Sequence, residues 1–214
     1  MGIESMGLRE SKKHETRQLI SDHATRLFME QGFEQTTIAE IATAARVAKK
    51  TVTNYFARKE DLALDHHEAF TAGLARAVAD RAAGESALAA LRREFVAAVE
   101  QCDPVAGFAG PEFARMIADS PTLTARLREL HDLREEALAE ALADDAPATA
   151  PVIAPRAAAA LLAAAHRLLF QRIQELTLAG EPNDRIAAAV APEATYVFDL
   201  LGTGLGEDLP AATA

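Results

Sequence analysis

The spacing of apolar residues predicts helices along almost the whole chain. Across residues 12–31, apolar side chains return every three or four positions, which places them on one face of a helix. These side chains are Leu19, Ile20, Ala24, Leu27 and Phe28. Strand-like alternation never extends beyond a few residues. We therefore expect an all-α fold.

Two short helices joined by a tight turn are predicted next. Thr37 stands three residues before Glu40, a spacing typical of the capping box that opens a helix, here over residues 38–45. A second short helix is expected over residues 49–56, and a long helix over residues 61–83 should follow it. Two short helices braced by longer ones are typical of a helix-turn-helix, whose second short helix lies in the major groove of DNA.

The rest of the chain predicts further helices separated by turn residues. They are expected over residues 86–101, 110–118, 121–143, 155–179 and 184–201. Three prolines between residues 144 and 155 predict a flexible connection there, and Pro192 is expected to divide the last helical stretch.

Composition and charge limit the functions that are possible. The chain has 214 residues, is 50% apolar and carries a net charge of −10. Residues 1–60 hold 10 basic and 8 acidic side chains, a net of +2, so the positive balance lies around the predicted helix-turn-helix. A single cysteine, Cys102, excludes an internal disulfide and fits a reducing compartment. Without a signal peptide or an uncharged apolar run of membrane length, we expect a cytoplasmic protein with no membrane partner.

A series of short motifs runs through residues 12–64 in a fixed order. They are Gln31-Gly32-Phe33, Thr36-Thr37-Ile38, Ile41-Ala42, Thr51, Tyr55-Phe56 and Lys59-Glu60. This series resembles the N-terminal region of the tetracycline-repressor (TetR) family of bacterial transcription regulators. Four positions depart from the family. Arg46 replaces a common turn glycine and is expected to cost about 1 kcal/mol at a positive φ, and Ala48 lacks the usual serine cap. Thr53 stands where many members have an aromatic residue, and Lys50 replaces a frequent glycine.

The resemblance implies both the organisation of the chain and its function. Residues 1–60 would form a three-helix DNA-binding domain, and residues 61–214 an all-helical ligand-sensing and dimerisation domain. The protein would then be a ligand-responsive regulator in the bacterial cytoplasm, associated with the nucleoid when bound to DNA. We expect a homodimeric repressor that a small apolar molecule releases from a palindromic operator in double-stranded DNA.

The same resemblance assigns the DNA contacts. The expected phosphate-positioning residues are Thr37, Lys49, Thr51, Tyr55 and Lys59, and Thr36 is also expected at the DNA interface. The expected base-reading residues are Lys50, Thr53 and Asn54.

Candidate residues in the second half are mostly apolar. Those expected to line a ligand pocket are Phe95, Val99, Cys102, Phe108, Phe113, Met116, Ile117, His131, His166 and Phe170. Those expected at the dimer interface are Leu161, Leu162, Ala165, Leu169, Ile173, Leu176, Tyr196 and Leu200. The bland alternative is that both sets pack only within their own chain.

The sequence favours two other classes of function less strongly. An enzyme is not expected, because no catalytic motif, metal-ligand spacing or cofactor-binding motif is present: the adjacent His66 and His67 lie about 100° apart on a helix, and Cys102 has no activating context. We therefore predict no metal and no cofactor. An all-helical adaptor or ligand-binding protein that has lost DNA binding is the alternative, favoured only by the departures at Arg46 and Ala48.

Overall fold

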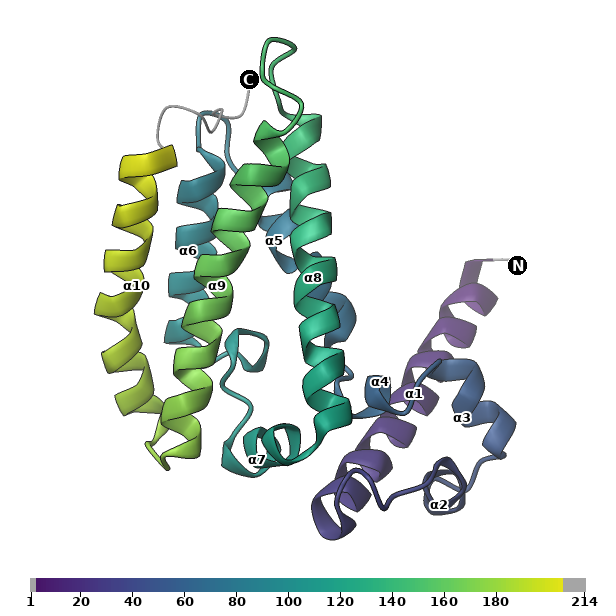
Figure 1. Ribbon diagram of the computed structural model, residues 1–214. Helices are drawn as coiled ribbons and strands as arrows, with labels where there is room; N and C mark the ends of the chain where they lie inside the picture. The colour runs from purple at the N-terminus through teal and green to yellow at the C-terminus, as the bar shows by residue number, and fades with distance from the viewer. Residues whose placement is uncertain (1–2, 206–214) are drawn as a thin grey trace. The chain divides into compact units, whose positions relative to one another are not determined.

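The computed structural model describes residues 3–205 and the side chains of residues 11–204. All regular structure in this part of the chain is helical, which confirms the all-α prediction (Figure 1). The helices are α1 (Ile3–Gln31), α2 (Ile38–Ala44), α3 (Lys49–Tyr55), α4 (Glu60–Ala63), α5 (His67–Ala79), α6 (Ala87–Glu100), the 3-10 helix η1 (Pro104–Ala106), α7 (Pro111–Asp119), α8 (Pro121–Asp144), α9 (Ala154–Leu178) and α10 (Asn183–Leu205).

The chain packs as two compact units. The first holds the described residues up to His67 together with residues 116–124, and the second holds residues 68–115 together with those from 125 onwards. The functional domain boundary expected at residue 60 remains a prediction, because compact packing does not show which residues bind DNA and which bind a ligand.

The first unit is built by α1 packing against α2 and α4, and by α2 packing against α3. Its largest fully buried side chains are Ile20, Phe28, Ile41, Leu62 and Leu123. The predicted capping box is present at the start of α2. The Thr37 hydroxyl accepts a hydrogen bond from the Glu40 amide at 3.2 Å, and the Glu40 carboxylate accepts one from the Thr37 amide at 2.8 Å.

The turn between α2 and α3 carries the backbone strain that the sequence predicts. Arg46 has a φ of 55°, the left-handed region that favours glycine. The amide of Val47 donates to the carbonyl of Ala42 at 2.9 Å, and the amide of Arg46 donates to Thr43 at 3.1 Å. These bonds close the end of α2 as a left-handed helix cap does. As expected, Ala48 begins α3 with no side-chain cap.

The long helix predicted over residues 61–83 is wrong, since the chain forms α4 and α5 with a break between them. Leu64 leaves the helical region at φ −105° and ψ 54°. The residues of α4 from Asp61 to Ala63 are buried, and the Ser21 hydroxyl donates to the Asp65 carboxylate at 2.6 Å. These tertiary contacts hold the chain in a turn that helix periodicity alone does not reveal.

The division predicted at Pro192 is also wrong, because α10 continues through it. Proline removes the hydrogen bond that its amide would give to the carbonyl four residues earlier. Both Pro192 and Ala188 are exposed, so that carbonyl can be hydrated instead. The predicted connection over residues 144–155 agrees with the structure, in which α8 ends at Asp144 and α9 begins at Ala154.

The second unit is organised around α9, which has α10 beside it (Figure 1). α10 also packs against α6. Fully buried core residues come from all three helices, among them Leu91, Leu162, Leu169, Ile173 and Phe198. Alanines on α9, such as Ala159 and Ala163, are also buried, and their small side chains let neighbouring helices approach closely.

Replacing Arg46 with glycine should stabilise the helix-turn-helix by about 1 kcal/mol, because glycine adopts the observed φ without the Cβ penalty. Hydrogen exchange of the α2 and α3 amides in the full chain measures this as slower local opening. Arg46→Ala is the matched control, since it removes the same charge but keeps the penalty. Equal protection in the two variants would contradict the explanation.

Candidate DNA interface and ligand cavity

The exposed face of α3 carries the polar residues that the sequence assigned to DNA. Lys49, Lys50, Thr53 and Asn54 are all exposed, and Val52 behind them is fully buried. The half-buried pair Thr51 and Tyr55 lies at the edge of this face. Helix periodicity explains the arrangement, since Val52 points into the core while its neighbours point away. The face offers two ammonium groups and short hydrogen-bonding side chains to one partner.

Thr36 does not fit the predicted DNA contact. Its side chain is fully buried, and its hydroxyl donates to the carbonyl of Gly32 at 2.9 Å. The same hydroxyl makes a second, longer hydrogen bond of 3.3 Å to the carbonyl of Leu27. The residue therefore secures the corner after α1, and the prediction that it faces DNA is wrong.

Lys59 is also used inside the protein. Its Nζ donates to the carbonyl of Phe33 at 2.7 Å and to that of Thr36 at 2.9 Å. The same ammonium lies 4.2 Å from the centroid of the Phe33 ring, a cation–π contact. Lys59 therefore braces the loop between α1 and α2. This corrects the assignment of its charge to a phosphate.

Thr37 is exposed, but its hydroxyl is engaged in the capping box, where it donates to the Glu40 carboxylate at 2.8 Å. Hydrogen bonds from the hydroxyl and the amide of Thr37 lower the pKa of Glu40. The structure thus gives Thr37 a definite structural role at the start of α2.

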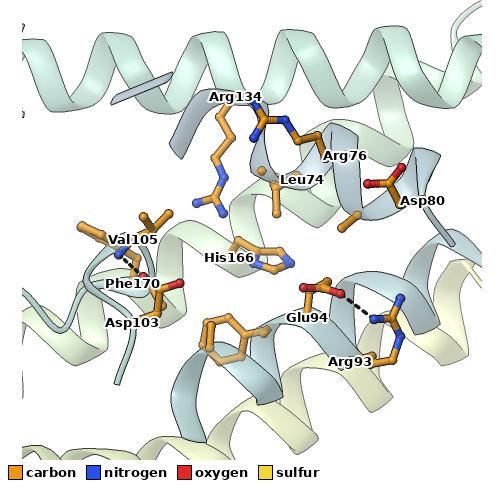
Figure 2. Close-up of a pocket in the computed structure, with 15 residues that line it drawn as sticks. Leu74, Arg76, Asp80, Arg93, Glu94, Asp103, Val105, Arg134, His166 and Phe170 are labelled. Atoms are coloured by element: carbon orange, nitrogen blue, oxygen red, sulfur yellow. Dashed lines mark hydrogen bonds and ion pairs between the residues drawn. The ribbon is translucent and has the colours of Figure 1, made fainter. Parts of the chain in front are cut away.

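A partly open cavity of about 300 Å³ lies within the second unit and is lined by residues of α5, α6, α8, α9 and η1 (Figure 2). This volume is at the lower end of the range usual for small-molecule sites. Its lining residues are Gly73, Leu74, Arg76, Ala77, Asp80, Arg93, Glu94, Phe95, Ala98, Asp103, Val105, Ala106, Arg134, His166 and Phe170.

Two histidines lie in aromatic clusters near this cavity. His166 makes edge-on contacts with Phe95 and Phe198, at centroid distances of 5.6 and 5.5 Å. His131 makes similar contacts with Phe70 and Phe170, at 5.0 and 5.3 Å. Edge-to-face geometry is favourable because the ring edge is positive and the ring face negative. The clusters fix both imidazoles in apolar surroundings.

These surroundings keep both imidazoles neutral. Burial, with a smaller contribution from the nearby Arg134 charge, lowers the pKa of His166 to about 3. Burial also lowers the pKa of His131 to about 4, with smaller contributions from Arg134 and Arg167. The Nε2 of His166 is buried without a hydrogen-bond partner among the described residues.

Of the ten residues predicted to line a ligand pocket, three do so in this cavity: Phe95, His166 and Phe170. Val99 and Phe108 are buried in the hydrophobic core, with Cys102 packed against it. His131 lies behind the cavity wall, in contact with Phe170. Phe113 is not part of the wall, and Met116 and Ile117 pack with the first unit. Periodicity identified buried residues but could not separate cavity from core.

Arg134 lines the cavity and was missed in the sequence analysis. It occupies one position in a series spaced four residues apart, whose other members are Leu130, Leu138 and Leu142. All three leucines are buried. A charged residue on the apolar face of a predicted helix was the signal that could have identified it.

The predicted dimer interface is partly wrong. Leu162, Ala165, Leu169 and Ile173 are buried within their own chain, so a partner cannot reach them. The exposed large apolar side chains of α9 and α10 are Leu161, Leu168, Leu178, Tyr196 and Leu200, and Leu176 is half-buried. The apolar stripe predicted on α9 is present, but most of its side chains pack into the core of the second unit.

The structure adds two observations about other kinds of site. Within residues 3–205, no helix has the length and apolarity that crossing a membrane needs. The described side chains also include no cluster of three or more acidic, histidine or cysteine residues placed to hold a metal ion.

The sequence and the fold are similar to known regulators. Residues 20–65 match the family described as bacterial regulatory proteins, tetR family, which confirms the resemblance seen in the sequence. The chain is 32% identical over 142 residues to the HTH-type transcriptional regulator TcmR of Streptomyces glaucescens. That match covers 64% of this chain and 63% of TcmR, so it spans less than two thirds of the relative.

Solved structures share the fold at lower identity. A putative TetR-family transcriptional regulator from Syntrophomonas wolfei str. Goettingen superposes with a TM-score of 0.54 and 18% identity, covering 86% of this chain and 95% of the other. The SmeT–triclosan complex superposes with a TM-score of 0.52 and 19% identity, covering 84% and 90%. These similarities establish the fold alone.

Acidification should destabilise the protein through its two buried histidines. Their folded pKa values lie below the unfolded value of about 6.5, so the unfolded state gains protons first as the pH falls. Each histidine should remove about 1.4 kcal/mol of stability per pH unit between about pH 6 and pH 4. Urea unfolding at several pH values measures this slope.

His166→Phe is the control, because it keeps an aromatic ring in the cluster and removes one titrating group. The variant should lose its share of the slope, about 1.4 kcal/mol per pH unit, while acidic side chains affect both proteins alike. An unchanged slope would show that His166 is not buried in its neutral form.

Proposed function

We propose that this chain, whose residues 20–65 are a tetR-family N-terminal domain, is a transcriptional regulator that binds operator DNA as a homodimer and is released by a small molecule. The observation that carries the proposal is the exposed polar face of α3, backed by a buried apolar side within a helix-turn-helix. The domain division at residue 60 and the localisation to the bacterial cytoplasm belong to the same proposal.

The α3 face has the chemistry that duplex DNA requires. Lys49 and Lys50 are exposed at its start, where they can approach phosphates or base edges. Thr53 and Asn54 follow on the solvent side, and their hydroxyl and amide groups can donate to or accept from base edges. Thr37, Thr51 and Tyr55 are proposed to position the backbone, whereas Thr36 and Lys59 act from within.

The departures that favoured an adaptor without DNA binding leave the motif intact. Arg46 adopts the positive φ that the turn needs, and the hydrogen bonds that close α2 are made. Ala48 removes one side-chain cap but α3 forms after it. Since the recognition helix is presented in full, DNA binding is the better supported of the two functions.

A homodimer follows from the exposed apolar residues of α9 and α10. Leu161 and Leu168 lie seven residues apart on one face of α9, and Tyr196 and Leu200 lie four apart on α10. The two helices pack against each other, and Arg172 is paired with Glu193 across them at 3.1 Å. Two such helix pairs can close a four-helix bundle around a two-fold axis, which matches a palindromic operator.

The cavity in the second unit supports release by a small molecule. SmeT, which shares this fold, is described as a complex with triclosan. For a ligand to release DNA, it must bind more tightly to a conformation that fits the operator poorly, and such coupling is usually about 1–3 kcal/mol. α8 supplies Arg134 to this cavity. Ser120, the residue before α8, belongs to the first unit, where its hydroxyl donates to Glu34 at 2.6 Å. A shift of α8 is the route that we propose for the signal.

Changing Lys49 and Lys50 together to alanine should weaken DNA binding and flatten its salt dependence. Each lost phosphate contact lowers the slope of log K against log salt by about 0.9, so the slope should fall by one to about two. Titration of a nonspecific duplex and of the DNA upstream of the gene, at several salt concentrations, measures both effects.

The matched control removes two exposed arginines from the second unit, Arg156 and Arg185. It changes the net charge equally but leaves α3 intact, so the slope should stay near that of the wild type. If the two double variants behave alike, α3 is not the DNA-binding surface.

Leu168→Glu should convert the dimer to a monomer near 22.8 kDa at micromolar concentration. Leu168 is 57% exposed in the single chain, so the change should not disturb the core, whereas burying its carboxylate in an interface would be costly. Sedimentation equilibrium measures the mass. Leu133→Glu on α8, at a site 41% exposed, is the control and should remain dimeric.

A further inference from the structure

Arg134 is a half-buried cation whose Nε is fully buried, and no carboxylate of the described residues neutralises it. Its guanidinium stacks on the Phe70 ring at 4.5 Å, and its Nε is buried with no hydrogen-bond partner. No carboxylate of the described residues pairs with it, and burial lowers its pKa to about 10. At that value it remains charged at neutral pH. An unpaired charge in such surroundings is costly, so a functional reason for its retention is expected.

A second arginine in the same unit shows what a neutralised buried guanidinium looks like. The Arg81 side chain is only 3% exposed, and it pairs with the Asp145 carboxylate at 2.8 Å. It also donates to the backbone carbonyls of Val78 and Glu85. The contrast indicates that Arg134 lacks the kind of carboxylate partner that Asp145 provides to Arg81.

The missing partner can enter through the cavity. Arg134 lines it, and Figure 2 shows its side chain extending from α8 toward His166. His166 is 4% exposed, and its Nε2 has no hydrogen-bond partner. Two buried nitrogen groups without partners therefore lie on the wall of one cavity. Buried polar groups normally have partners, so two unpaired ones in a hollow of this size indicate a ligand or bound water.

The acidic residues of the lining do not supply the missing charge. The Glu94 carboxylate pairs with Arg93, and Arg93 also pairs with Glu85. Arg93 and Glu94 are exposed to solvent. The Asp103 carboxylate accepts a hydrogen bond from the Val105 amide at 2.8 Å. Asp80 is exposed, where water screens its charge.

Apolar side chains complete the wall. Leu74, Phe95 and Phe170 are buried and line the same hollow. Their surfaces suit a compact ring system beside the half-buried guanidinium. A hydrogen bond between charged groups is stronger in such a site than in water.

We infer that the cavity binds an organic monoanion with a compact apolar body, whose carboxylate pairs with the Arg134 guanidinium and accepts a hydrogen bond from the imidazole of His166. This inference rests on the proposed small-molecule response and names its ligand class. It adds a negative charge to the mostly apolar small ligand predicted from the sequence. Of the other two arginines in the lining, Arg76 is exposed and Arg93 is paired with Glu85 and Glu94, so Arg134 is left to supply one compensating charge. The acidic groups around the cavity oppose a dianion, so a carboxylate is favoured over a phosphate monoester.

The test compares 2-naphthoate with its neutral isostere 2-naphthamide on the full-length protein by isothermal titration calorimetry. A charge-assisted hydrogen bond should favour the carboxylate by about 10- to 100-fold in Kd. 2-Naphthyl phosphate should bind less tightly than the carboxylate. If the amide binds as tightly as the carboxylate, or if none of the three binds, the inference is overturned.

Variants assign the preference to the named residues. Arg134→Met should abolish the preference for carboxylate, and His166→Phe should reduce it severalfold. Arg128→Met, at an exposed site on the same helix, is the matched control and should keep the full preference. A carboxylate preference that survives Arg134→Met would overturn the assignment.

The melting temperature of the ligand-free protein gives an independent readout. Since Arg134→Met removes an uncompensated half-buried charge and keeps an apolar stem, it should raise Tm. A purely structural arginine, held by Phe70, would instead make this variant less stable. A lower Tm together with unchanged naphthoate binding would overturn the ligand role.

DNA titration separates this inference from the proposed function. If naphthoate binds through Arg134 but leaves DNA affinity unchanged, the ligand class stands and release by ligand fails. If only neutral compounds bind and lower DNA affinity, release stands and the monoanion inference fails.

Discussion

The second unit depends on the burial of α9 along most of its length. Nearly every turn of this helix contributes a buried side chain, from Ala158 near its start to Thr177 near its end. Close packing of this kind requires small residues where helices approach, which explains why the segment is rich in alanine. The same burial leaves only a narrow exposed strip, with Leu161 and Leu168, for any partner subunit.

The burial of α9 also places the chemistry of the cavity. His166 and Phe170 lie on the buried side of this helix, between residues that fill the core. A polar side chain there must find a partner, and the aromatic rings around His166 offer none. Arg134 approaches from α8 and meets the same apolar surroundings. The core thus provides a stable wall in which the Nε of Arg134 and the Nε2 of His166 have no hydrogen-bond partner among the described residues.

Charged side chains are used in two different ways in this protein. Lys59 and Arg81 are held by backbone carbonyls or a carboxylate, so they stabilise loops and helix ends. Lys49 and Lys50 are exposed on α3, and Arg134 is half-buried without a carboxylate partner among the described residues, so none of the three is used in this way. Residues with the same formal charge are therefore either held by partners within the fold or left available for a partner outside it. Residue type alone cannot separate these roles.

The sequence by itself determined the helical fold, the capping box and the helix-turn-helix, because these depend on contacts between residues close in the chain. Helix periodicity identified Val52 as buried behind the α3 face, and the left-handed turn was anticipated at Arg46. Local spacing also marked α9 as strongly apolar. These features need no knowledge of which helices become neighbours.

Only the tertiary structure decided which side chains with similar sequence patterns contact one another. It buried Thr36, turned Lys59 inward, and broke the helix expected to run past Leu64, each through contacts with distant segments. It also placed Arg134 beside His166, which lies 32 positions later in the chain. Periodicity shows that a side chain faces inward, but whether it meets packed core or open cavity depends on the helices that surround it.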